Sequence, residues 1–184
     1  MSRLLISVDT EASGPCPLRG DVISFGAVVI EPGLSRCYRS MDMRPTVDAY
    51  DPAAYRAIGV TRAEHEAYPH TMEESFRHFN AWLEALDSDR LIMVSDNPGF
   101  DFQWMNFGFM TTIGSNPLGH SARRIGDMWA GLRRREHETL GWKKLRITAH
   151  THDPLEDALG NAEAYLRMWD YEVGYEDAQA FYGR

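Results

Sequence analysis

Two carboxylates, Asp9 and Glu11, stand two residues apart at the end of an apolar run, in the stretch SVDTEASGP over residues 7–15. On a strand, residues i and i+2 point to the same face, so both side chains project together if the strand continues between them. Gly14 and Pro15 end the strand, which places the pair where open α/β sheets keep their ligand crevices. A solvated strand end is the alternative, because Asp-x-Glu arises about once by chance in a chain of this size.

A third carboxylate, Asp101, lies in SDNPGFDFQW, residues 95–104, directly after an apolar run. It falls in the first turn of an expected helix whose neighbouring residues are strongly apolar, so its carboxylate is expected to face a cleft and to need a partner. Phe100 and Trp104 flank it and could stack on a nucleic-acid base. Core packing at helical spacing is the alternative for these aromatic residues.

A histidine and a fourth carboxylate come together in AHTHDPLEDALGNAEAYL, residues 149–166. Asp153 is a good N-cap, which puts His152 just before the cap and Asp157 at the fourth helical position. Side chains at those two positions commonly meet, and apolar partners are usual there. A His and an Asp instead indicate a polar pocket, whereas His150 is assigned a structural or supporting role. A histidine that only hydrogen-bonds near a helix start is the alternative.

The elements that must position these residues follow from periodicity and capping. Apolar runs rich in Val, Ile, Leu and Phe predict strands, and Thr71 with Glu74 predicts a capping box at the start of an amphipathic helix. Antiparallel strands first, then alternating helices and strands, predict an α/β fold with a mixed sheet covered by helices. The expected strands are 3–9, 21–30, 35–41 and 91–95, and the expected helices are a short one ending near Gly59 and 71–86, 99–113, 127–137 and 154–170.

Length and composition bound the kind of protein. The chain has 184 residues, 43% of them hydrophobic and 25% charged, which predicts one globular domain over residues 1–184. No apolar run is long enough for a signal-peptide core or a membrane span, so we expect a soluble, cytoplasmic protein without membrane contact. The net charge of −8 argues against coating nucleic acid by bulk electrostatics, although residues 123–146 are locally basic. Cys16 and Cys37 are expected to be reduced thiols.

The five residues Asp9, Glu11, Asp101, His152 and Asp157 occur in an order that resembles the DEDDh family of 3′-to-5′ exonucleases, which includes the polymerase proofreading subunit, RNase T and oligoribonuclease. The resemblance is carried by Asp-x-Glu followed by the strand DVISFGAVVI, by NPGFDFQWM and by HDPLED, and it extends from about residue 3 to residue 170. It implies a ribonuclease H-like fold, a five-stranded mixed sheet flanked by helices. The loop that ends at Leu18 differs from the family pattern, at a position that usually packs on the terminal nucleotide.

The resemblance also implies chemistry: metal-dependent 3′-to-5′ hydrolysis of single-stranded ends to nucleoside 5′-monophosphates. Asp9, Glu11, Asp101 and Asp157 would hold two divalent cations, Mg²⁺ or Mn²⁺, with Asp9 bridging both and Asp101 acting through water. His152 would be the general base, because an unperturbed histidine pKa of about 6.5 is close to working pH. RNA is slightly favoured over DNA, by analogy with small free-standing relatives.

The locally basic stretch supplies candidate contacts to the substrate. Four basic side chains are candidate phosphate contacts, with a solvated charged surface as the alternative: Arg123, Arg124, Lys143 and Lys144. A homodimer is left open.

The competing functions are a catalytically idle member of the fold that binds nucleic acid or a partner, and a proofreading module that works inside a polymerase assembly. A ribonuclease H endonuclease is less favoured, because the His-x4-Asp motif is typical of the exonucleases.

Overall fold

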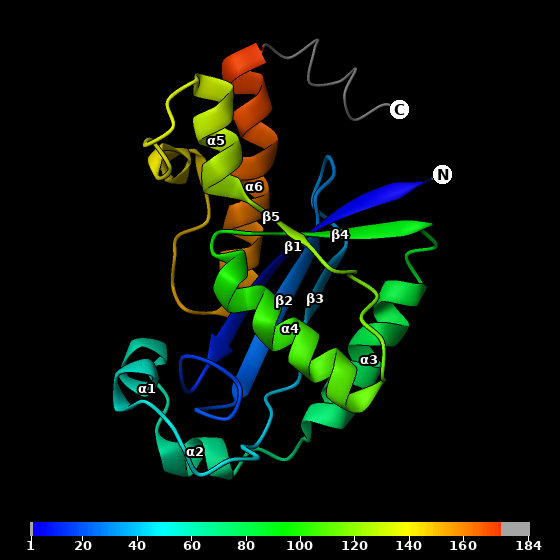
Figure 1. Ribbon diagram of the computed structural model, residues 1–184, viewed down its shortest axis with the longest axis vertical. Helices are drawn as coiled ribbons and strands as arrows, with labels where there is room; N and C mark the ends of the chain where they lie inside the picture. Colours follow the sequence, from blue (N-terminus) through cyan, green and yellow to red (C-terminus); the bar gives the residue numbers. More distant parts are fainter. Residues whose placement is uncertain (1, 174–184) are drawn as a thin grey trace.

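A five-stranded mixed sheet forms the centre of the protein, whose computed structural model describes residues 2–173 (Figure 1). The strand order is β3-β2-β1-β4-β5. β1 pairs antiparallel with β2 and parallel with β4, while β3 and β5 form the edges. This sheet confirms the predicted architecture. The strands are β1 (Arg3–Ala12), β2 (Val22–Val29), β3 (Cys37–Arg39), β4 (Arg90–Ser95) and β5 (Ala122–Arg124).

Helices cover both faces of the sheet, and each face has its own apolar cluster. Phe76 and Phe109, from two of these helices, pack with Phe25 of β2 on one face. Trp129 and Tyr165 pack with the opposite face. All eight residues of β2 are buried as a result. The helices are α1 (Pro52–Ile58), α2 (Arg62–Glu66), α3 (Met72–Glu84), α4 (Pro98–Thr112), α5 (Ile125–Arg133), the 3₁₀-helix η1 (Gly141–Leu145) and α6 (Pro154–Val173).

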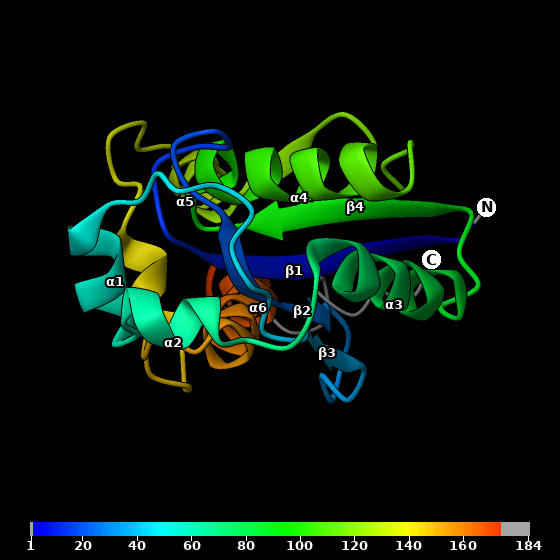
Figure 2. The ribbon, with the colours of Figure 1, turned by 90° about the horizontal axis from the view of Figure 1, so that it is seen from below.

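Local capping explains where several helices begin. Thr71 and Glu74 form the predicted capping box of α3, in which the Thr71 N–H donates to the Glu74 carboxylate at 2.8 Å. Thr61 and Glu64 form the same motif at α2. Figures 1 and 2 show α1 and α2 together at the end of the molecule toward which β1 points. This end holds the carboxyl ends of β1 and β4.

Four elements differ from the predictions. β5 was not predicted, because its sequence is Ala-Arg-Arg and it is a strand only through pairing with β4. The short helix α2 and the 3₁₀-helix η1 were also missed, since neither is long enough to show a periodic pattern. α5 was expected over 127–137 but ends at Arg133, because Arg134 adopts a left-handed conformation with φ of 54°.

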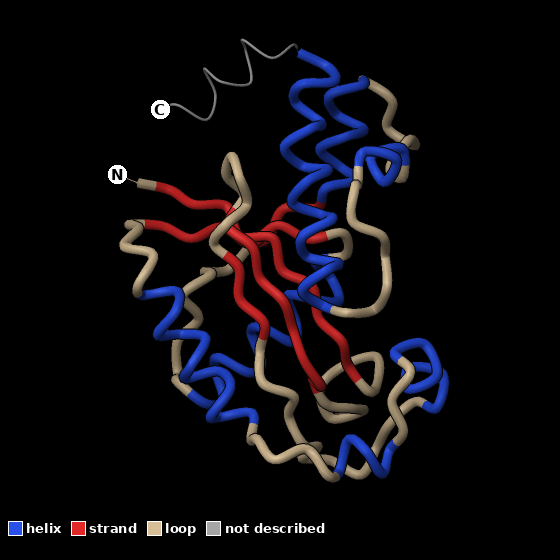
Figure 3. The backbone as a smooth tube through the Cα atoms, turned by 180° about the vertical axis from the view of Figure 1, so that it is seen from behind, coloured by secondary structure: helices blue, strands red, loops and turns tan. Residues whose placement is uncertain are grey.

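Helix α6 crosses directly over β1 and β2, and Figure 3 shows it beside the strands from the opposite side. The Ser7 hydroxyl of β1 donates to the Ala158 carbonyl of α6 at 2.8 Å. Gly26 of β2 lies under the start of α6, where a Cβ would stand 2.2 Å from the Pro154 carbonyl oxygen. Because Gly26 is paired with Asp9 of β1, this close approach brings the first turn of α6 to the carboxylates at the end of β1.

Along residues 2–173, no helix is long and apolar enough to cross a lipid bilayer.

Candidate active site

Three carboxylates from two elements meet at the carboxyl end of β1. β1 runs through Ala12, so Asp9 and Glu11 share one face of it as predicted. Asp157 of α6 joins them, and one oxygen from each of the three side chains lies within 4.8 Å of the others. Glu11 is 8% exposed and Asp157 is fully buried. The structure thus brings together residues almost 150 positions apart in the sequence.

Asp101 lies beside this group, in the first turn of α4, and is 4% exposed. Its Oδ1 accepts hydrogen bonds from the Thr10 backbone N–H at 3.0 Å and the Thr10 hydroxyl at 2.7 Å. Its Oδ2 accepts from the Ser95 hydroxyl at the end of β4. The expected partner of this buried carboxylate is therefore a pair of hydroxyl residues, Thr10 and Ser95, that no motif singled out.

Burial raises the pKa values of Asp9, Glu11 and Asp101, and repulsion among the carboxylates adds to this at Asp9 and Glu11. Burial, and then the charges of Asp101, Glu11 and Asp157, raise the pKa of Asp9 well above its usual value. Burial and neighbouring carboxylates raise the pKa of Glu11 to about 8. Burial raises the pKa of Asp101 to about 6, against the effect of its hydrogen bonds. Such a cluster is costly to ionise unless cations compensate it.

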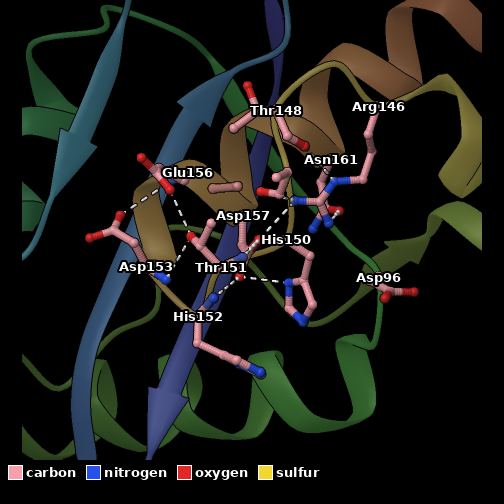
Figure 4. Close-up of polar contacts among 12 residues, drawn as sticks. Asp96, Arg146, Thr148, His150, Thr151, His152, Asp153, Glu156, Asp157 and Asn161 are labelled. Atoms are coloured by element: carbon pink, nitrogen blue, oxygen red, sulfur yellow. Dashed lines mark hydrogen bonds and ion pairs between the residues drawn. The ribbon is translucent and has the colours of Figure 1, made fainter. Parts of the chain in front are cut away.

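Asp157 differs from the other carboxylates because four donors surround it (Figure 4). Its Oδ1 accepts from Arg146 Nη2 at 2.7 Å and from the Thr151 backbone N–H at 3.3 Å. Its Oδ2 accepts from the His152 backbone N–H at 3.0 Å and lies 2.7 Å from His150 Nδ1. Burial alone would raise the pKa of Asp157, but the hydrogen bonds from His150 and Arg146 outweigh it and lower the pKa.

The side chain of His152 does not meet Asp157, which corrects the expectation from the capping pattern. His152 has a left-handed backbone with φ of 62°, and its ring points away from Asp157 in Figure 4. Its Nδ1 lies 3.5 Å from Glu11 Oε1, and its side chain is 40% exposed. His150, which was expected to have only a supporting role, makes the contact with Asp157 instead. The centroids of the His150 and His152 imidazole rings lie 4.5 Å apart.

The apolar residues predicted to contact substrate, Phe100, Trp104 and Leu18, divide between core and surface. Trp104 is 1% exposed and packs in the core on the α3 and α4 side of the sheet, so its ring has no free face for a base and the stacking expectation is corrected. Phe100 is partly buried and packs against Trp104 edge to face. Leu18 is 75% exposed, with φ of 75°. Its loop is tied to α4 by Gln103, which donates to the Pro15 carbonyl at 3.0 Å.

Two of the predicted phosphate contacts converge on Asp96, in the turn between β4 and α4. Lys143 Nζ lies 2.8 Å from Asp96 Oδ2, and Arg124 Nε donates to the Asp96 carbonyl at 3.3 Å. Figure 4 draws Asp96 on the side of the site where His150 lies. The charge of Asp96 contributes to the raised pKa of Asp101, so these two side chains meet next to one of the site's carboxylates.

The other two predicted phosphate contacts are engaged elsewhere. Arg123 Nη1 donates to the Tyr165 hydroxyl at 3.4 Å. Lys144 Nζ lies over the Trp129 ring, 5.3 Å from its centroid. Each of these side chains therefore contacts an aromatic residue that packs on the α5 and α6 side of the sheet.

The donor set fits hard divalent cations. Carboxylate oxygens are the ligands that Mg²⁺ and Mn²⁺ prefer, and a thiolate-selecting metal finds no cysteine among the clustered groups of the described residues. Two divalent ions about 4 Å apart are typical of phosphodiester-cleaving sites. The raised pKa values of Asp9 and Glu11 indicate negative charge that bound cations would stabilise.

Comparison with known proteins gives both a sequence relative and a fold. No family model matches the chain. It is 27% identical over 176 residues to the 3′-5′ DNA exonuclease Cap18 of Escherichia coli, covering 88% of this chain and 89% of Cap18. The nuclease domain of 3′hExo, a DEDDh family member bound to rAMP, superposes with a TM-score of 0.74 at 14% identity, covering 94% of each chain.

A second structure gives the same fold within a longer protein. E. coli Exonuclease I in complex with a dT13 oligonucleotide superposes with a TM-score of 0.66 at 16% identity, covering 97% of this chain and 43% of that one. The predicted ribonuclease H-like architecture is confirmed by these superpositions. The motifs, the fold and the similarity to Cap18 agree with one another, and they confirm the resemblance predicted from the sequence: the chain is similar in sequence to a 3′-5′ DNA exonuclease and in fold to a DEDDh family nuclease.

Proposed function

We propose that the protein hydrolyses single-stranded nucleic acid from the 3′ end and releases nucleoside 5′-monophosphates. The observation that carries this proposal is the cluster of Asp9, Glu11 and Asp157, with one oxygen of each within 4.8 Å of the others and two of the three side chains buried. A cluster of this kind weakens the fold unless cations bind there, so its presence favours a catalytic site over a structural one. The whole chain, residues 1–184, would form one exonuclease domain.

In this proposal Asp9, Glu11 and Asp157 hold two divalent cations, Mg²⁺ or Mn²⁺. When bound, the cations would stabilise the charge that develops on the attacking, leaving and nonbridging oxygens of the phosphate. Asp101, whose oxygens already accept from Thr10 and Ser95, contributes through water. Its hydrogen bonds keep the carboxylate in one orientation beside the cluster.

His152 is the proposed general base. Its side chain is partly exposed at the edge of the cluster and lies next to Glu11. A ring nitrogen of His152 would take the proton of the attacking water, and the nearby carboxylate favours the imidazolium that results. Left-handed backbone at a residue other than glycine costs free energy and often marks functional sites, which also supports this role.

For the substrate we propose single-stranded 3′ ends, and DNA before RNA. The name of Cap18 specifies DNA, and this relationship outweighs the analogy that favoured RNA from the sequence. The net charge of −8 disfavours extended duplex contact, whereas a short single strand needs only a few cations. Arg124 and Lys143, beside Asp96, are the proposed phosphate contacts nearest the carboxylates.

The test uses 5′-labelled single-stranded DNA and RNA of one sequence, incubated with the purified chain and Mn²⁺ or Mg²⁺. We expect a ladder that shortens from the 3′ end, is abolished by EDTA, and falls at least about 100-fold in Asp101→Ala and His152→Ala. His120→Ala, at an exposed histidine on the β4 to β5 connection, is the matched control and should keep full activity.

Three results would contradict the proposal. Full activity of His152→Ala at saturating Mg²⁺ would remove the general base assigned here. Cleavage of a circular single strand would indicate an endonuclease. Binding of the oligonucleotide without cleavage, together with no divalent-ion binding in calorimetry, would favour the catalytically idle member of the fold.

A further inference from the structure

Arg146 is a buried cation that none of the sequence motifs includes. Its side chain is 10% exposed, and its Nη2 lies 2.7 Å from Oδ1 of the fully buried Asp157. Charged side chains are buried this deeply only when they are paired and hydrogen-bonded. Its partner is one of the proposed cation ligands, so the contact belongs to the architecture of the active site.

The guanidinium of Arg146 also organises the segment that follows it in the chain. Its Nε donates to the Thr148 carbonyl at 3.3 Å and its Nη2 to the Ala149 carbonyl at 3.4 Å. Its Nη1 donates to Asn161 Oδ1 of α6 at 3.4 Å. Figure 4 shows the arginine reaching from this segment toward α6. The segment therefore wraps around its own arginine just before it supplies the two histidines of the site.

Gly160 leaves the space that the guanidinium fills. A Cβ at Gly160 would stand 2.4 Å from Arg146 Nε, 2.6 Å from Nη2 and 2.8 Å from Cζ. Glycine in a helix interior costs about 1 kcal/mol relative to alanine. Gly160 therefore lowers helix stability at a buried position of α6 where the arginine needs room. This close approach is a second observation for the role of Arg146, independent of its hydrogen bonds.

We propose that Arg146 is a positioning residue of the active site: seated against Gly160, it fixes the carboxylate of Asp157 and the 148–152 segment in one geometry. It does not touch substrate. This inference rests on the proposed function and deepens it. Groups that orient metal-binding side chains typically contribute 10- to 100-fold to activity or metal affinity.

Two variants test this role: Gly160→Ala fills the space that the guanidinium occupies, and Arg146→Lys replaces the guanidinium itself. Gly160→Ala raises helix propensity, so a structural role alone predicts a protein that is at least as stable and fully active. We expect instead that kcat on labelled single-stranded DNA falls about tenfold or more, while KM changes by less than about threefold. Arg146→Lys keeps the charge but loses the planar guanidinium, so its kcat should lie between those of wild type and Gly160→Ala.

Arg167→Ala is the matched control, because Arg167 on α6 donates to the Leu145 carbonyl at 2.9 Å and not to a carboxylate of the site. It should keep the wild-type kcat. A loss of kcat in Arg167→Ala equal to that in Gly160→Ala would assign both effects to general loosening of α6 and would overturn the proposal.

Amide hydrogen exchange of the metal-free protein gives a readout that needs no activity. The N–H groups of Thr151 and His152 both donate to Asp157, so we expect them to exchange about tenfold faster in Gly160→Ala and Arg146→Lys than in wild type or Arg167→Ala. Wild-type exchange in Gly160→Ala would overturn the inference. If the exchange rates change as expected but wild type cleaves no nucleic acid, the proposed function fails and the positioning role stands.

Discussion

At the scale of single residues, the site sets three carboxylates with raised pKa values beside one whose pKa is lowered. The pKa values of Asp9, Glu11 and Asp101 are raised, chiefly by burial, whereas hydrogen bonds from Arg146 and His150 lower that of Asp157. Asp157 is thus ionised at neutral pH without bound cations. Binding of divalent cations would release protons mainly from the carboxylates of β1.

Glu11→Gln tests this at the residue scale. The folded-state pKa of Glu11 is about 8 against an unperturbed 4.5, so the folded protein binds the extra proton and its free energy of unfolding falls as pH rises from 4.5 through 8. The variant lacks this loss. In EDTA it should be more stable than wild type at pH 8, by up to about 4 kcal/mol, and about equal at pH 4.5, as measured by denaturant unfolding. Equal stability at pH 8 would contradict the raised pKa.

At the scale of elements, the site depends on how closely α6 approaches the sheet. Ser7 holds the helix by a buried hydrogen bond to the Ala158 carbonyl. Gly26 lets the first turn lie directly on β2, opposite Asp9. Asp157 reaches the β1 carboxylates only because the missing side chain at Gly26 leaves room for Pro154 and Leu155.

Gly26→Ala tests this at the element scale. The new Cβ would stand 2.2 Å from the Pro154 carbonyl oxygen and 2.5 Å from the Leu155 Cα, which are backbone atoms that cannot turn aside. We expect a loss of about 1–3 kcal/mol in the free energy of unfolding and a loss of exonuclease activity beyond what reduced folding explains. Gly131→Ala, in α5 with open space around the position, is the control and should be at least as stable as wild type and fully active. Full activity of Gly26→Ala would show that the approach of α6 is not critical.

At the scale of the whole molecule, an acidic chain carries basic side chains next to its acidic site. Net charge is −8, yet Lys143 and Arg124 come together at Asp96 from η1 and from the residue before α5. A strand of nucleic acid would compete with Asp96 for Lys143. Affinity for a single strand is then expected to depend on a few cations and on ionic strength.

Lys143→Ala tests this at the molecular scale. We expect KM for single-stranded DNA to rise, kcat to stay close to wild type, and the slope of log affinity against log salt to become shallower by about 0.7, as for one lost phosphate contact. Binding is measured by fluorescence anisotropy across a salt series. Arg77→Ala, an exposed arginine paired with Glu73 on α3, should leave the slope unchanged. An unchanged slope in Lys143→Ala would indicate a solvated surface charge.

The sequence by itself determined the fold class and the identity of the clustered carboxylates. Alternating strands show which side chains share a face, so Asp9 and Glu11 were predictable as a pair from spacing alone. Capping chemistry set the start of α6 and with it the location of Asp157. These features are local, because they depend on residues within one turn or one strand.

Only the tertiary structure decided which groups contact the carboxylates. Arg146, Thr10 and Ser95 lie 11, 91 and 6 positions from the carboxylates that they contact, and none of them belongs to a periodic pattern, so no local signal identifies them. The left-handed backbone at His152 turned its ring toward Glu11 and left His150 to contact Asp157. Burial of Trp104 likewise depends on packing between α4 and the sheet. Contacts of this kind depend on how separate elements approach one another, which spacing along one element does not encode.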